Sequence, residues 1–217
     1  MHYFDTAVER DPKNILFLMN RSQCFFDQSL FQEAIDDLST ALGTEGNDSH
    51  PQLLYKLGLA FFAFDKYRRC IRTMKRAIKA GPYLTYEADI YYHTGLAFCR
   101  LERFEESIFP FSKAISLIPN DIRYIHERAK ALQMIDQHQM AIDNFSDVIK
   151  KNPKNAHAYF RRAFSLKALG KYEPAALDFE KAKALDPLNP KLVVNYKQLK
   201  GVSCIVLCRP GEEKVYN

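Results

Sequence analysis

Three histidines are the residues of this chain best suited to metal or acid–base chemistry: His93, His126 and His157. Neutral imidazole is a common ligand of zinc, copper and nickel, so three such rings brought together would suit one of these ions. Histidines at a binding surface are more often ordinary hydrogen-bonding groups. We therefore expect no metal at these residues.

The remaining candidates for chemistry are weaker. Cys204 and Cys208 lie near each other without a second cysteine pair or a nearby histidine, whereas a structural zinc site takes four protein ligands. The sequence has no glycine-rich phosphate loop, and no Ser–His–Asp or Cys–His arrangement stands out. We therefore predict no catalytic residue, no cofactor and no metal, and expect a chain that is not an enzyme.

Basic residues are concentrated in one stretch, which contains Lys66, Arg68, Arg69, Arg72, Lys75, Arg76 and Lys79. Exposed aromatic residues do not alternate with these cations, as they do on many surfaces that bind single-stranded nucleic acid. The net charge of the chain is a mild +5. We favour a solvated helix face, then a surface for an acidic protein partner, and RNA third, so nucleic acid is not the expected partner.

The composition is that of a folded chain without membrane segments. The 217 residues are 47% hydrophobic and 26% charged. The longest apolar run, residues 57–64, is far shorter than the roughly 20 residues that cross a bilayer, and the N-terminal residues show no secretory signal. Five cysteines, an odd number, do not suggest a disulfide framework. We expect no membrane association and a cytoplasmic, reducing compartment.

The elements that position these residues follow from a repeat of about 34 residues. A proline recurs at Pro12, Pro82, Pro119, Pro153 and Pro187. Small residues recur in two columns, at Ser22, Gly58, Gly95, Ala129 and Ala163 and at Ala34, Cys70, Ser107, Ala141 and Ala175. A large apolar residue recurs at Phe4, Leu38, Met74, Phe111, Phe145 and Phe179. Because these independent columns share one register, we interpret the chain as an array of similar units.

Each unit holds two amphipathic helices. Small residues where two helices cross allow close approach, and the large residues fill the space beside them. The proline follows the second helix because it cannot continue one, and an Asn or Asp after the proline can cap the next helix.

This pattern resembles the tetratricopeptide repeat family over residues 1 to about 200. The family's usual tryptophan is replaced here by Leu18, Leu54, Tyr91, Ile125 and Tyr159. The resemblance implies an all-α fold, a right-handed superhelical solenoid of antiparallel helix pairs. It is specific for the fold and nearly silent on function.

We predict a solenoid over residues 1–200 and a C-terminal tail over 201–217. Within the solenoid we expect a half repeat, five full repeats and a capping helix, which span residues 1–14, 15–48, 51–84, 88–121, 122–155, 156–189 and 190–200 in turn. The half repeat resembles a second helix whose first helix is missing. The half repeat could serve as the N-terminal cap, but terminal repeats usually have a polar outer face, and Tyr3, Phe4 and Val8 are apolar. We therefore favour a fragment or isoform of a longer array. The tail has no firm interpretation.

The first helices of the repeats are expected to form the inner wall of the solenoid, and with it a groove for a partner. The candidate groove residues are Met19, Asn20, Gln23, Tyr55, Lys56, Tyr92, His93, Arg123, His126, Lys130 and Arg161. The groove is aromatic near its start and charged near its end, which suits an extended peptide or a partner helix. For Leu59, Phe62 and Leu96 we favour packing between neighbouring first helices.

One branch of the family binds the C-terminal carboxylate of chaperones through Lys, Asn and Arg in consecutive repeats. The matching positions here do not carry that set in any of three registers, and Asp89 or Glu127 at two of them would repel a carboxylate. We therefore expect a ligand other than a chaperone C-terminal carboxylate.

These features predict a non-catalytic protein–protein interaction module, or scaffold, that binds a peptide or helix of an unidentified partner in its groove. The alternative is a structural subunit of a larger multiprotein assembly, for example of ciliary, transport or ubiquitin-ligase type, held by its ends and outer face as well. Nucleic-acid binding is a distant third.

Overall fold

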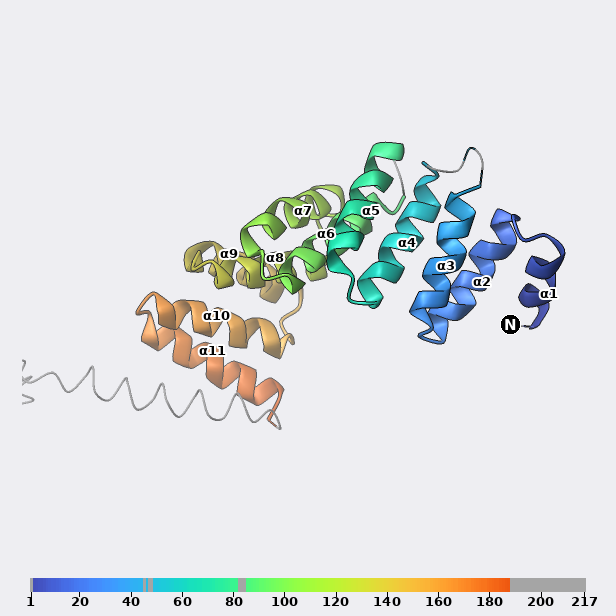
Figure 1. Cartoon of the computed structure of the whole chain (residues 1–217). Coiled ribbons are helices and arrows are strands. Elements are labelled where there is room, and N and C mark those ends of the chain that lie inside the picture. The colour runs from blue at the N-terminus through green and yellow to red at the C-terminus, as the bar shows by residue number, and fades with distance from the viewer. Residues whose placement is uncertain (1, 45, 47–48, 82–84, 188–217) are drawn as a thin grey trace, which may run out of the picture. The chain divides into compact units, whose positions relative to one another are not determined.

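The structure is a computed structural model that describes residues 2–44, 46, 49–81 and 85–187. These residues form eleven α-helices and no β-strand (Figure 1). The helices are α1 (His2–Arg10), α2 (Ile15–Asp27), α3 (Phe31–Leu42), α4 (Pro51–Ala63), α5 (Tyr67–Ala80), α6 (Glu87–Arg100), α7 (Phe104–Leu117), α8 (Ile122–Met134), α9 (His138–Lys151), α10 (Ala156–Ala168) and α11 (Tyr172–Leu185). The all-α class is confirmed. The predicted capping helix at 190–200 and the tail at 201–217 lie outside the described residues.

The chain divides into two compact units, residues 1–120 and 121–217. Unit 1 contains α1–α7, and the described part of unit 2 contains α8–α11. This division was not predicted, because the sequence columns run through it without a break. The handedness and the repeat boundaries of the whole array stay predictions.

Consecutive helices pack as pairs within each unit. The pairs are α2 with α3, α4 with α5 and α6 with α7 in unit 1, and α8 with α9 and α10 with α11 in unit 2. The first helices α4 and α6 also contact each other, as do α8 and α10. The first helices of neighbouring repeats therefore lie side by side, and the solenoid of helix pairs is confirmed.

The small residues lie where the two helices of a pair approach most closely. A Cβ atom added to Gly58 would lie 2.7 Å from Cε of Met74, and one added to Gly95 would lie 2.6 Å from Cε1 of Phe111. Met74 and Phe111 are themselves fully buried. The columns of small and large residues thus mark the helix crossings, as the sequence predicts.

The turn strings supply helix caps. The side chains of Asn14, Asp121 and Asn155 accept backbone N–H bonds at the starts of α2, α8 and α10. Capping satisfies backbone donors that the first turn of a helix leaves without partners. The predicted role of Asn and Asp after the proline is confirmed at these three positions.

A second periodic feature lies in the turn inside each pair. Ser29, Asp65, Glu102, Asp136 and Gly170 have φ of 62°, 56°, 58°, 57° and 72°. This left-handed conformation favours glycine, but only the last of these turns has one. The column was missed because no residue type marks it.

A polar bridge joins the two helices of the α2/α3 pair and of the α10/α11 pair. Arg21 on α2 donates two hydrogen bonds to Asp37 on α3, at 2.8 and 2.7 Å. Arg162 on α10 makes the same two-bond contact with Asp178 on α11, at 2.7 Å for both bonds. Asp37 and Asp178 are buried, so each bridge is a largely buried ion pair between the two helices.

Candidate functional site

Unit 1 contains a pocket of about 300 Å³ beside its first helices. Its lining residues are Ser22, Gln23, Phe26, Leu38, Gln52, Tyr55, Lys56, Leu59 and Tyr86. Helices α2 and α4 supply most of them, because the inward positions of two adjacent first helices face the same space. Three predicted groove residues, Gln23, Tyr55 and Lys56, therefore share one pocket.

One wall of the pocket is aromatic. The rings of Tyr55 and Tyr86 stack with their centroids 4.6 Å apart and an angle of 15° between their planes. Burial, with a smaller contribution from the Asp89 charge, raises the pKa of Tyr55 to about 12. The phenol is therefore neutral at physiological pH and can donate or accept a hydrogen bond beside its apolar ring.

The rim of the pocket is polar. The ammonium group of Lys56 donates to Oε1 of Gln23 at 2.7 Å, and Nε2 of Gln23 donates to Oδ1 of Asp27 at 2.9 Å. A lysine ammonium carries three donor hydrogens, and this bond uses one. The rim therefore offers a cation and an amide next to an aromatic wall.

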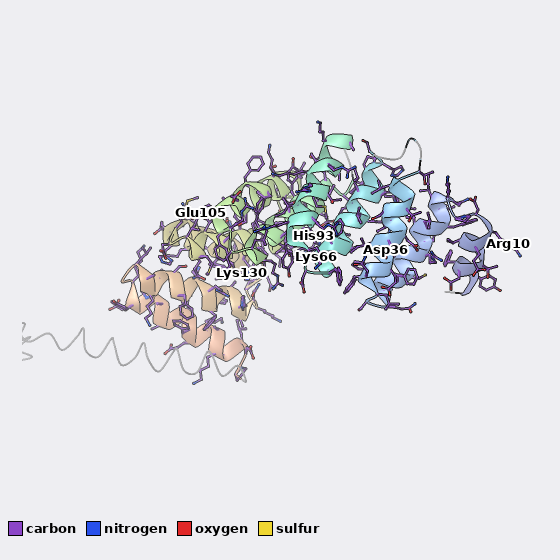
Figure 2. The ribbon with its side chains drawn as sticks, in the orientation of Figure 1. Arg10, Asp36, Lys66, His93, Glu105 and Lys130 are labelled. Carbon is purple, nitrogen blue, oxygen red and sulfur yellow. The ribbon has the colours of Figure 1, made fainter. Side chains whose placement is uncertain are left out.

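The other predicted residues of unit 1 do not line this pocket. Met19 packs against the core, and Asn20 is half-buried on α2. His93 lies on α6 (Figure 2), where Nδ1 is 2.8 Å from the carbonyl oxygen of Asp89. Tyr92 contacts the rings of His93 and Phe111, with centroids 5.3 and 6.1 Å away. Tyr92 and His93 on α6 therefore contact each other and neighbouring residues and do not line the pocket.

Unit 2 brings together three of its four predicted groove residues. His126 on α8 and His157 on α10 face each other, with Nε2 of His126 3.0 Å from Nδ1 of His157. Lys130 and Arg161 lie close enough to act on the charge of His126. Arg123 is separate: it is exposed, and its guanidinium contacts the helix-capping Asp121 at 2.6 Å.

Both histidines of this cluster are kept neutral. Burial first, and then the His157, Lys130 and Arg161 charges, lower the pKa of His126 to about 4. Burial also lowers the pKa of His157, with Arg161 and Lys130 acting in the same direction. A cationic surrounding of this kind opposes the binding of a metal ion.

Two buried nitrogen atoms of the cluster have no hydrogen-bond partner in the described part of the chain, Nδ1 of His126 and Nε of Arg161. The Arg161 guanidinium does donate through Nη1 to Oε1 of Gln133, at 3.2 Å. Burial lowers the pKa of Arg161, although an arginine stays charged in proteins. Nε of Arg161 is therefore a dehydrated donor without an acceptor among the described residues.

The metal-ligand candidates are divided between regions. His93 belongs to unit 1, whereas His126 and His157 belong to unit 2. Across residues 2–44, 46, 49–81 and 85–187, no group of three or more His, Cys, Asp and Glu residues is arranged to bind a metal ion. Cys204 and Cys208 lie outside those residues.

Two contributors to these sites were missed in the sequence. Tyr86 precedes α6 and was not considered, because the groove was expected to be formed mainly by the first helices. Gln133 donates to the carbonyl of Arg161 at 2.9 Å and to Oγ of Ser165 at 2.8 Å, and so fixes the cluster of unit 2. Gln133 lies one helical turn after Lys130, and this spacing could have indicated that the two residues share one face of α8.

The sequence model of the tetratricopeptide repeat matches residues 2–51, 55–122 and 127–190. The match covers most of the chain, and the chain therefore belongs to the tetratricopeptide repeat family. Members of this family mediate protein–protein interactions.

Among curated proteins, the chain resembles parts of longer relatives. It is 37% identical over 86 residues to small glutamine-rich tetratricopeptide repeat-containing protein 2 of Mycosarcoma maydis, a match covering 40% of this chain and 24% of that protein. It is 22% identical over 220 residues to the DnaJ homolog subfamily C member 7 homolog of Dictyostelium discoideum, a match covering 92% of this chain and 39% of that protein. It is 23% identical over 190 residues to Hsp70-Hsp90 organizing protein 3 of Arabidopsis thaliana, covering 86% and 33%. The chain thus spans less than two fifths of the length of each relative.

Solved structures show the same fold. YrrB, described as a TPR protein with an unusual peptide-binding site, matches with a TM-score of 0.77 at 19% identity, covering 90% of this chain and 97% of that one. MamA matches with a TM-score of 0.73 at 19% identity, covering 80% of this chain and 92% of that one.

Two further expectations concern membrane association and chaperone carboxylates. Within the described residues, no helix has the length and apolar character needed to cross a membrane. The expected exclusion of chaperone carboxylates is not supported by the relatives, because several of them are Hsp70-Hsp90 organizing proteins. That exclusion stays a prediction.

Proposed function

We propose that this chain is a non-catalytic interaction module that binds a peptide or helix of a partner protein along the inward positions of its first helices. The unit 1 pocket carries the proposal, because it joins an aromatic wall of Phe26, Tyr55 and Tyr86 to the polar rim of Gln23 and Lys56. Ligand sites typically combine apolar walls with a few directed polar groups. A pocket of about 300 Å³ is large enough for an apolar side chain of a peptide whose backbone bonds to the rim.

The cluster of unit 2 supports the same function in a second place. The buried Nε of Arg161 has no hydrogen-bond partner in the described residues, and an unsatisfied buried donor is costly. A shift of the Arg161 side chain towards a carbonyl or an acidic side chain of a bound peptide would satisfy it. YrrB, a solved structure with the same fold, is described as having an unusual peptide-binding site.

A peptide selection tests the proposal. Peptides selected from a random library on the full chain should bind the double variant Tyr55→Ala/Lys56→Ala about tenfold or more weakly, because it removes a wall and a rim donor of the pocket. The control variant Lys150→Ala/Lys154→Ala changes exposed residues of unit 2 and should bind as the unchanged chain does. Equal binding by all three proteins, each with unchanged circular dichroism, would contradict the groove.

Chaperone tails need a separate comparison. The side chains at the clamp positions, including Asp89 and Glu127, oppose a carboxylate, whereas the names of the relatives make such a tail a natural test. We expect a peptide of the Hsp90 C-terminus to bind no better than its C-terminal amide. A marked preference for the free carboxylate would show that the exclusion is wrong.

A structural subunit of a larger assembly is the second candidate, and exposed apolar residues on the second helices favour it. Phe109 on α7 is 64% exposed and Leu177 on α11 is 67% exposed. If the chain is held by exposed residues of its second helices, Phe109→Gln and Leu177→Gln should release its partners while Tyr55→Ala/Lys56→Ala should not. A cytoplasmic, reducing location stays a prediction for either candidate.

A further inference from the structure

The outer surface of α5 is basic along its whole length. The α5 basic face consists of Arg68, Arg69, Arg72, Lys75, Arg76 and Lys79, and all six residues are exposed. The opposite side of the helix, which includes Cys70, Met74 and Ala77, is buried against the core of unit 1. Because the face points away from the first-helix pocket, it is a separate surface from the proposed groove.

The positive charge of the chain is concentrated on this helix. Helix α5 has six of the 31 Lys and Arg residues and none of the 26 Asp and Glu residues. The rest of the chain therefore has 25 basic and 26 acidic residues, and its charges nearly balance. The positive net charge of the chain therefore comes from α5.

The arrangement is unfavourable for the isolated fold. Arg68 and Arg72, and Lys75 and Lys79, are like charges one turn apart, which destabilises a helix. Arg68 and Arg69 also lie in the first turn of α5, where the helix dipole favours acidic residues and none is present. In the described part of the chain, no carboxylate oxygen lies within 4.0 Å of the side-chain nitrogens of Arg68, Arg69, Arg72, Lys75 or Lys79.

The other second helices of unit 1 do not share this character. In the repeat register, Arg69 corresponds to Glu33 on α3 and Glu106 on α7, and Arg72 corresponds to Asp36 on α3. Figure 2 labels Asp36, Glu105 and Lys66, which lie on α3, on α7 and just before α5. Helix α3 carries three acidic residues and no basic one, and α7 carries two acidic residues and one lysine. Of the three paired second helices of unit 1, α5 alone presents six cations and no carboxylate, which suits a partner of opposite charge.

We propose that the α5 basic face binds an acidic segment of a partner protein. A helix of 14 residues is roughly 20 Å long, which matches a short stretch of Asp and Glu residues. A nucleic acid strand carries its charge beyond that length and would meet the acidic residues of α3 and α7. Helix α5 has no exposed aromatic residue for base stacking, since Tyr67 is half-buried.

Fluorescence anisotropy with a defined probe tests this surface on the full chain. The probe is a labelled peptide of alternating Glu and Ala with about as many carboxylates as the face has cations. The test variant is Arg68→Glu/Arg72→Glu/Lys75→Glu, which leaves Arg69 in place because its guanidinium lies 5.0 Å from the centre of the Phe61 ring. The control variant Lys150→Glu/Lys154→Glu/Lys181→Glu makes the same change in net charge on exposed residues of unit 2.

We expect the unchanged chain and the control to bind the acidic peptide, with a salt-dependent affinity, and the test variant to bind about tenfold or more weakly. Three results would overturn the proposal: no binding of the peptide at low salt, equal weakening in test and control variants, or tighter binding of an oligouridylate of equal charge. The last result would assign the face to nucleic acid. Tyr55→Ala/Lys56→Ala should leave this binding unchanged, so the groove and the α5 basic face can fail separately.

Discussion

At the scale of single residues, two glycines on first helices occupy equivalent positions but face different partners. Gly58 faces the end of the Met74 side chain, and Gly95 faces the ring of Phe111. A methionine side chain can turn about several bonds, whereas a buried phenylalanine ring cannot give way without moving its helix. The same small-residue column therefore predicts different tolerance in neighbouring repeats.

We predict that Gly95→Ala destabilises the protein by about 2 kcal/mol, because the new methyl group would lie 2.6 Å from Cε1 of Phe111. Gly58→Ala should cost less than about 1 kcal/mol, since Met74 can shift and alanine favours the helix. Urea unfolding of both variants measures the difference. Equal losses, or a larger loss for Gly58→Ala, would show that the rigidity of the partner does not decide the cost.

The His126 imidazole gives a second prediction at this scale, a loss of stability in weak acid. Its pKa is about 4 in the folded chain against 6.5 for a free histidine, so the unfolded chain binds the proton more readily. The stabilising contribution is complete above pH 6.5 and is lost as the pH falls towards 4, by about 3 kcal/mol in all. Urea unfolding across this range should show a shallower pH dependence for His126→Gln than for the unchanged chain. Identical slopes would mean that His126 is not buried in its neutral form.

At the scale of elements, the polar bridges between paired helices form a series with a natural variation. Arg128 on α8 makes two hydrogen bonds to Oδ1 of Asn144 on α9, at 3.0 and 2.7 Å. Asn144 therefore occupies the place that Asp37 and Asp178 have in other pairs. The bridge needs an acceptor oxygen at this position, and a full negative charge is not required for its geometry.

We predict that Asp178→Asn costs about 1 kcal/mol, whereas Asp178→Ala costs about 3 kcal/mol because it leaves the half-buried Arg162 guanidinium with Ser146 Oγ as an acceptor but without its carboxylate. Adding Arg162→Met to Asp178→Ala should recover part of the loss, since the stranded charge is then removed. Thermal unfolding of these three variants and of Arg162→Met alone gives the comparison. A double variant as unstable as the sum of its parts would rule out coupling between the two side chains.

Sequence patterns predicted most of the helices but not the polar bridges and the left-handed turns that connect them. The columns of Gly58, Met74 and Phe111 predicted helix pairs and their crossings, because each needs one size of residue. The Arg–Asp bridges were missed because their residues stand 16 positions apart and outside the apolar columns. The left-handed turn at Glu102 was missed because four of the five such residues are not glycine.

At the scale of the molecule, the pocket and the cluster belong to separate units. The periodicity predicted that Gln23, Tyr55 and Lys56 share one face, and the pocket brings them together. The periodicity did not predict that Tyr92 and His93 on α6 would contact neighbouring rings outside the pocket. A repeat register fixes the side of the helix on which a residue lies but not how deeply its side chain is buried. The contribution of Tyr86 depends on the path of a connector, which no helical period determines.

The central claim is that a partner is held by the inward positions of the first helices, and site-specific photo-crosslinking in cells tests it most directly. A photoreactive phenylalanine would replace Tyr55 in the pocket, or Asp36 on the exposed side of α3 as the matched control. We predict that the Tyr55 position crosslinks a discrete partner and that the Asp36 position does not crosslink the same one. A partner captured from Asp36 and not from Tyr55 would contradict groove recognition.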